Sequence, residues 1–211
     1  MSKLNWNYDE VKKGATEEGF TTLTTGPQIV KILKAEDIEE KQYLKIYLDI
    51  AEGALKDYFK EMYDRNTYDE KKWPNQATLY RSYKDSAKYF FAGFITAVEK
   101  SNDGFVFNPD KDWGQQLKGK LFVANFGEQE YISDETDSNS KLIVKTIPKI
   151  IETRSIKALK EGKVEAPKLT KLGKSDFEYK GVGEEDITRT PDMQASDTQE
   201  HYNNVEEDLP F

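Results

Sequence analysis

The chain has 211 residues, no cysteine, a single histidine and a formal net charge of −8. The absence of cysteine excludes disulfides, thiolate metal sites and cysteine nucleophiles. No apolar run approaches the roughly 18 residues of a membrane span, and residues 1–10 lack the apolar stretch of a signal peptide. We therefore expect a soluble protein of the cytoplasm.

The net charge is concentrated at one end of the chain. Residues 1–180 contain 30 Lys+Arg and 30 Asp+Glu, whereas residues 181–211 contain nine acidic residues and Arg189 as their only base. Within the body, residues 141–180 carry eleven basic residues against five acidic ones, a local charge of +6. The acidic average therefore does not exclude a nucleic-acid partner, because a neutral body, a basic strip and an acidic tail have to be considered separately.

Two β-segments are predicted first along the chain, after an N-terminal arm at residues 1–25 that we expect to pack on the body. Residues 28–35 are rich in β-branched side chains, and residues 42–50 follow a polar turn with strict alternation. This pattern predicts an antiparallel hairpin with one buried and one accessible face. The buried face would carry Leu44, Ile46, Leu48 and Ile50, and the accessible face Tyr43, Lys45, Tyr47 and Asp49.

A long insertion at about residues 54–118 changes the apolar period. Apolar residues at helical spacing predict one helix from Leu55 to Tyr63 and another over residues 87–98, which would bury its three phenylalanines, at positions 90, 91 and 94. Residues 77–83, between the two helices, predict a third strand.

The body ends with two further predicted strands, at residues 120–131 and 141–151, and a short helix at 154–161. We place the limits of the body at residues 26 and 172. Five strands with inserted helices favour a mainly β fold of the OB kind, a five-stranded, partly open Greek-key barrel. An α+β sandwich would give much the same pattern. The remaining polar composition predicts a disordered acidic C-terminal tail, with a flexible linker at 173–204 and an acidic tip at 205–211.

Residues that could carry catalysis are scarce. The only histidine, His201, lies in the expected tail, so His-based acid/base pairs, triads and metal ligands cannot form within the folded body. Carboxylates at 36–40 and 134–137 could hold Mg²⁺ for a nuclease, but they fall in polar turns where solvated charge is the ordinary explanation. We expect no enzymatic activity, no cofactor and no metal, with a metal-dependent nuclease as a remote alternative.

Aromatic and basic side chains alternate on the accessible face of the second strand. Tyr43, Lys45 and Tyr47 recur about 6.5 to 7 Å apart, which suits single-stranded nucleic acid because bases stack on the rings and the cation meets the phosphates. The alternative is that tyrosines favour strands and pack against the inserted helices. The full set of residues predicted to contact single-stranded DNA is Tyr43, Lys45, Tyr47, Trp73, Tyr80, Arg81, Tyr83, Lys84, Lys141, Lys145, Lys149 and Arg154.

The chain ends in three acidic residues followed by an apolar tip. Acidic tails are usually only solubilising, but a terminal aromatic residue suits a partner pocket flanked by basic side chains. The residues predicted to bind such a partner are Glu206, Glu207, Asp208, Leu209, Pro210 and Phe211.

This ending closely resembles the acidic tip of bacterial and phage single-stranded DNA-binding proteins. The body is similar to a family of OB-fold proteins that are encoded by phages of Gram-positive hosts and resemble single-stranded DNA-binding proteins. The stretches that carry the resemblance are Asn5-Trp6, residues 26–53 with Tyr43-Leu44-Lys45-Ile46, Gly119-Lys120-Leu121-Phe122, and residues 154–172.

The resemblance implies cooperative, sequence-independent binding that coats and protects single-stranded DNA during phage replication or recombination in the bacterial cytoplasm. It also implies that the tip recruits a helicase, primase, polymerase or recombinase, and it leaves a homo-oligomer open. The insertion at 54–118 and the lack of tryptophan on the second strand depart from the cellular pattern. An alternative from another class is a recombination mediator or adaptor whose body binds protein rather than DNA.

Deleting residues 200–211 is expected to tighten binding of single-stranded DNA at low salt, because the acidic tail would occupy a basic groove when DNA is absent. Titrating oligo-dT with the full-length and the truncated chain at low and high salt checks this expectation. Unchanged or weaker affinity of the truncated chain at low salt contradicts it.

Overall fold

The computed structural model describes residues 22–68 and 70–189. The N-terminal arm up to residue 21, His201 and the acidic tip therefore lie outside the described residues. The strands are β1 (Gly26–Ile38), β2 (Tyr43–Ile50), β3 (Thr78–Ser82), β4 (Leu121–Thr136), β5 (Leu142–Arg154) and β6 (Ile187–Arg189). The α-helices are α2 (Tyr58–Arg65), α3 (Lys88–Glu99), α4 (Trp113–Leu117), α5 (Ile156–Lys160) and α6 (Lys174–Lys180), and the 3-10 turns are η1 (Glu39–Lys41), η2 (Asn75–Ala77), η3 (Asp85–Ala87) and η4 (Glu184–Asp186).

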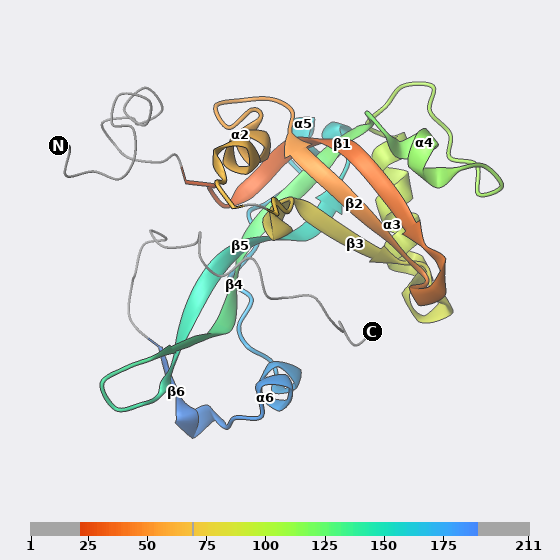
Figure 1. Ribbon diagram of the computed structural model, residues 1–211. Helices are drawn as coiled ribbons and strands as arrows, with labels where there is room; N and C mark the ends of the chain where they lie inside the picture. Colours follow the sequence, from red (N-terminus) through yellow and green to blue (C-terminus); the bar gives the residue numbers. More distant parts are fainter. Residues whose placement is uncertain (1–21, 69, 190–211) are drawn as a thin grey trace.

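The strands form one open, mixed sheet in the order β3-β2-β1-β4-β5-β6. All neighbours are antiparallel except β5 and β6, which run parallel. The long β4–β5 hairpin extends away from α3 and α4, and β6 and α6 lie along its far part (Figure 1). The mainly β fold with inserted helices and the five predicted strands are confirmed, while β6 was not predicted.

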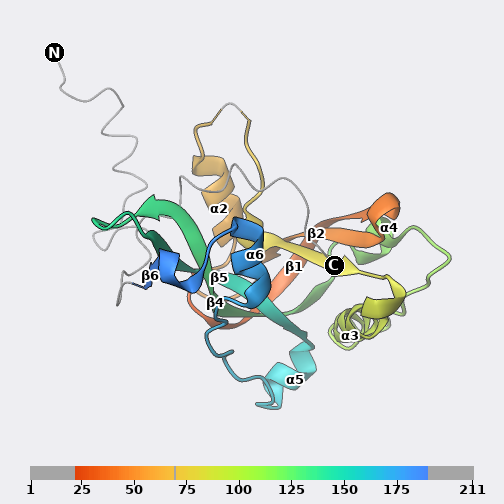
Figure 2. The same cartoon turned by 90° about the horizontal axis from the view of Figure 1, so that it is seen from below.

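The core lies on one face of β2, which we call the inner face. Its four apolar residues at even positions from Leu44 to Ile50 are completely buried, as the alternation predicts. They meet the buried side chains of Ile32 on β1 and Phe122 on β4, and α3 adds Phe94 and Val98. Helix α3 lies at one end of the molecule beside the end of β3, and α4 packs against β1 (Figure 2).

The expectation that α3 buries three phenylalanines is wrong for one of them. Phe94 is fully buried, but Phe90 is 78% exposed. Neighbouring residues on a helix diverge by about 100°, and Phe91 is the one turned toward the rings of Tyr83 and Trp113, at 6.0 and 5.5 Å. Phe90 therefore projects into solvent.

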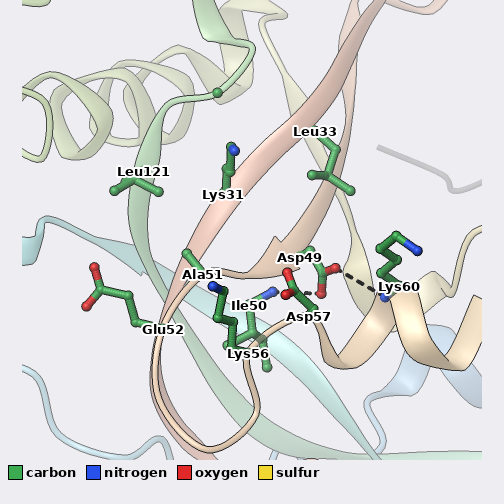
Figure 3. Close-up of a pocket in the computed structure, with 11 residues that line it drawn as sticks. Lys31, Leu33, Asp49, Ile50, Ala51, Glu52, Lys56, Asp57, Lys60 and Leu121 are labelled. Atoms are coloured by element: carbon green, nitrogen blue, oxygen red, sulfur yellow. Dashed lines mark hydrogen bonds between the residues drawn. The ribbon is translucent and has the colours of Figure 1, made fainter.

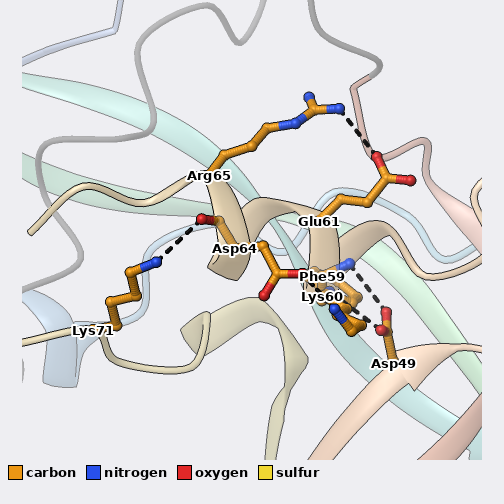
Figure 4. A network of polar contacts seen from close by, with 7 residues as sticks. All are labelled: Asp49, Phe59, Lys60, Glu61, Asp64, Arg65 and Lys71. Carbon is orange, nitrogen blue, oxygen red and sulfur yellow. Dashed lines mark hydrogen bonds and ion pairs between the residues drawn. The ribbon is translucent and has the colours of Figure 1, made fainter. Parts of the chain in front are cut away.

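Asp49 lies on the outer face of β2, but it is only 4% exposed because α2 begins over it. Its carboxylate accepts a hydrogen bond from the Ile50 N–H at 2.9 Å, and it accepts from the N–H groups of Phe59 and Lys60 at 3.0 and 3.2 Å (Figure 4). Burial raises the pKa of Asp49, while these three donors act in the opposite direction. A side chain from the strand thus satisfies the free N–H groups at the start of the helix.

The segment after α5, which lies within the predicted body, folds back along β4. Thr170 pairs with β4 through hydrogen bonds of 2.8 Å to Glu128 and Glu130. Upstream of it, Pro167 packs so closely on Gly127 that a Cβ there would lie 2.9 Å from the proline ring. Glycine is required at position 127 because any side chain would push this segment off the strand.

Residues 174–189, which the sequence analysis assigns to a flexible linker, contain α6, η4 and β6. Their apolar residues, such as Phe177 and Ile187, pack with Ile132 and Val144 of the β4–β5 hairpin in a second, smaller cluster. The sequence does not predict this packing, because the apolar residues of the segment are few and do not recur at the spacing of a helix or a strand. Glu130 adds a polar anchor, since its carboxylate accepts from the Leu172 N–H and the Arg189 guanidinium.

The variant Asp49→Ala is expected to lower the free energy of unfolding by about 1–3 kcal/mol, because it leaves buried N–H groups of α2 without an acceptor. Urea unfolding followed by circular dichroism measures this loss. The matched control is Asp64→Ala, whose carboxylate pairs with Lys60 on the exposed side of α2 and which should unfold close to wild type. Equal stability of the two variants contradicts the assigned role of Asp49.

Candidate nucleic-acid interface

The outer faces of β1, β2 and β3 bring aromatic and charged side chains together. The registers pair Lys34 with Tyr47, Glu36 with Lys45, and Lys45 with Tyr80, so these residues share the face opposite the core. The alternation that buries Leu44 and Ile46 leaves this face accessible. We call this surface the tyrosine–lysine patch; it consists of Lys34, Glu36, Tyr43, Lys45, Tyr47 and Tyr80.

Lys45 is the centre of the tyrosine–lysine patch. Its ammonium nitrogen lies 5.5 Å from the ring centroid of Tyr47 and 6.0 Å from that of Tyr80. The Tyr80 ring in turn meets the Tyr43 ring edge to face, with centroids 5.5 Å apart. One cation therefore makes cation–π contacts with two rings, and the third ring joins the patch through its contact with Tyr80.

Glu36 brings a negative charge into the same patch. Its carboxylate accepts the phenolic hydrogen of Tyr47 at 2.9 Å and forms an ion pair with Lys34. The hydrogen bond from Lys34 is the main influence that lowers the pKa of Glu36, against the opposing effect of burial. The sequence analysis placed Glu36 in a polar turn. In the structure β1 continues to Ile38, so Glu36 lies in the strand directly opposite Lys45.

Arg81, which the sequence analysis grouped with Tyr80, lies on the other face of β3. It pairs with Leu44 and so points to the inner side of the sheet. Burial lowers the pKa of the guanidinium to about 10, and its Nε atom is buried without a hydrogen-bond partner among residues 22–68 and 70–189. Adjacent residues of a strand face opposite ways, so Tyr80 and Arg81 cannot both belong to the patch.

Tyr83 and Trp73 are also held away from the patch. The Tyr83 ring packs edge to face on Trp113 at 5.1 Å, and its hydroxyl donates to Asp37 at 2.8 Å. Burial and this hydrogen bond raise the pKa of Tyr83 to about 12. The Trp73 indole donates to the carbonyl of Leu48 at 3.1 Å, at the point where β2 extends beyond β3. Both rings anchor local structure, and Lys84 lies at the turn into η3.

The predicted basic residues of the β4–β5 hairpin form a separate region. Lys145 forms an ion pair with Glu135, and Arg154 pairs with Glu152. Lys141, directly before β5, and Lys149, within β5, are both exposed. The outer face of β4 nearer to β1 is covered, because the Asn125 side chain donates to the carbonyl of Glu165. The covering segment thus separates these cations from the tyrosine–lysine patch.

No family model matches the chain, and no curated protein matches it. Within residues 22–68 and 70–189, no three or more His, Asp or Glu side chains are grouped so that they could hold a metal ion. None of the helices in this part of the chain has the length and apolar character needed to cross a membrane.

The variant Glu36→Gln is expected to lower the pKa of Tyr47. Burial and the hydrogen bond to the Glu36 carboxylate both raise that pKa in the wild type, and the variant removes the negative charge. Titrating ¹³Cζ-labelled tyrosine by NMR follows each ring separately, and the exposed Tyr89 on α3 serves as an internal control. A pKa of Tyr47 that stays unchanged contradicts the described contact.

Proposed function

We propose that the chain is a single-stranded DNA-binding protein that recognises DNA independently of sequence, and that it coats and protects DNA in phage replication or recombination. The observation that carries this proposal is the tyrosine–lysine patch, in which the ammonium group of Lys45 lies over the rings of Tyr47 and Tyr80, and the Tyr43 ring packs against Tyr80. The proposal includes no catalytic step.

The chemistry of the patch fits an unpaired strand. Every base has a π-face, so stacking on tyrosine is tolerant of sequence and contributes about 1–3 kcal/mol per base. Lys45 and Lys34 supply cations for the phosphates between the stacked bases, which adds salt-sensitive affinity. Duplex DNA would hide its base faces within its own stack, so the exposed ring of Tyr80 and the partly exposed rings of Tyr43 and Tyr47 favour the single-stranded form.

The sheet order supports the OB-fold as the finer architecture. The order β3-β2-β1-β4-β5 is that of a five-stranded Greek-key barrel opened between β3 and β5. On the open side, η2 and α3 both contact β5, and α3 fills the interior with Phe94. In OB-folds the face of the second and third strands binds oligonucleotides, and the tyrosine–lysine patch lies on that face of β2 and β3.

The acidic tip belongs to the proposal as the docking element for a replication or recombination protein. It lies outside the described residues, so its support is the sequence alone: three acids followed by Leu209, Pro210 and Phe211. An apolar end flanked by acids suits a pocket lined by basic side chains.

Oligo-dT binding, measured by fluorescence anisotropy at about 50 and 200 mM salt, tests the proposed function. The double variant Tyr43→Ala with Tyr47→Ala is expected to bind at least about tenfold more weakly, because two stacking rings are lost. Lys45→Gln is expected to reduce the slope of log K against log salt by about 0.7. Tyr89→Ala, which removes an exposed ring on α3, is the matched control and should bind like wild type.

Three outcomes contradict the proposal. No binding at about 50 mM salt favours a body that binds protein, as in an adaptor. Equal affinity of the double variant and the wild type removes the patch as the interface. Degradation of the oligonucleotide only when Mg²⁺ is present would instead indicate a nuclease.

A further inference from the structure

A hollow of about 450 Å³ lies on the outer face of β1 and β2, next to the tyrosine–lysine patch. Asp49 follows Tyr47 as the next outward position of β2, and Lys31 is its partner on β1. A bulge between Ile32 and Lys34 places the unpaired Leu33 at the wall of the hollow. The hollow therefore continues the patch along β2 by one outward step, about 6.5 to 7 Å.

The lining of the hollow combines apolar, basic and acidic groups. Leu33 and Leu121 supply apolar surface from β1 and β4, and Figure 3 shows them with Lys31 between them on the same side of the hollow. Lys56 and Asp57 come from the turn before α2, and the Asp57 carboxylate lies beside that of Asp49 (Figure 3).

Asp57 is the acidic group available to a ligand. The neighbouring Asp49 carboxylate is already committed to three backbone N–H groups. By contrast, no hydrogen bond or ion pair within the described residues engages the Asp57 carboxylate. The left-handed backbone at Asp57, with φ 60°, holds this exposed side chain at the mouth of the hollow.

The two adjacent carboxylates decide which ligand chemistry fits. The lining carries three lysines (Lys31, Lys56 and Lys60) against three acids, so the hollow as a whole offers a phosphate no net attraction, and beside Asp49 and Asp57 a phosphate would be repelled. The described residues do not offer a set of ligands for a metal ion. A planar group with an exocyclic amine satisfies the same site, because one of its faces meets the two leucines and its amine donates to the free carboxylate. Asp and Glu accept from the exocyclic amine of cytosine in the same way in other nucleic-acid complexes.

We propose that this hollow is a subsite for one further base of the bound strand, and that it prefers a base with an exocyclic amino group, such as cytosine, over thymine. The base lies against Leu33 and Leu121 with its amine on the Asp57 carboxylate. Lys31 and Lys56, at the rim, meet the flanking phosphates. The inference rests on the proposed function, since it places a nucleotide beyond Tyr47 on the same strand.

Anisotropy titrations with oligo-dC and oligo-dT of equal length, about 12 nucleotides, test the subsite at pH 8. The wild type is expected to bind oligo-dC about three- to tenfold more tightly than oligo-dT, which is the net contribution of one ordinary hydrogen bond at a site open to solvent. Asp57→Gly removes the carboxylate while keeping a residue that accepts the left-handed backbone. This variant is expected to bring the ratio close to one without weakening oligo-dT binding. Asp57→Asn should keep part of the preference, since it retains an acceptor oxygen.

Two controls separate the subsite from general charge effects. Glu52→Gln removes another acid of the rim and should leave the ratio as in wild type. The double variant Lys31→Gln with Lys56→Gln should weaken both oligonucleotides equally and lower the salt slope by about 0.7 for each lysine.

An oligo-dC to oligo-dT ratio near one in the wild type overturns the inference, and so does a ratio that Asp57→Gly leaves unchanged. If the Tyr43→Ala and Tyr47→Ala double variant loses affinity in the same assay, the proposed function stands and the subsite alone has failed. If the double variant binds like wild type, the proposed function has failed as well.

Discussion

Strand β2 can bury only one of its two faces, and the organisation of the molecule follows from this constraint. Its inner face, from Leu44 to Ile50, meets β1, β4 and α3 and forms the centre of the main core. The outer face is then free to carry side chains that a core would not accept, and β1 and β3 extend it on both sides. Asp49 ends this accessible strip, because α2 begins over it.

Charges on the outer face are arranged as pairs rather than as a uniformly basic surface. Glu36 lies among the cations of the tyrosine–lysine patch, and Asp57 lines the adjacent hollow together with Lys31 and Lys56. Under the proposed function, each carboxylate reduces the non-specific attraction for phosphate, and the free carboxylate of Asp57 offers an acceptor that distinguishes one base from another. In that proposal ring stacking supplies the affinity and the acids supply the discrimination.

The sequence predicted the five main strands because their alternation is a local property, and it predicted that Tyr43, Lys45 and Tyr47 share one face. It could not predict which neighbours join that face. Tyr80 and Arg81 look equivalent in sequence, yet the pairing of β3 with β2 sends Arg81 inward. Glu36, α6 and β6 were missed for the same reason: strand length, register and packing between distant segments decide their places.

The pairing of β1 with β4 has a consequence for the order in which the chain can fold. Gly26 lies opposite Phe126, so this edge of β1 gains its partner only after a further 100 residues. During synthesis β1, β2 and β3 can pair with one another first, and the second edge of β1 stays open in the meantime. We expect this unpaired edge of β1 to be the point at which a nascent or slowly refolding chain associates with other chains.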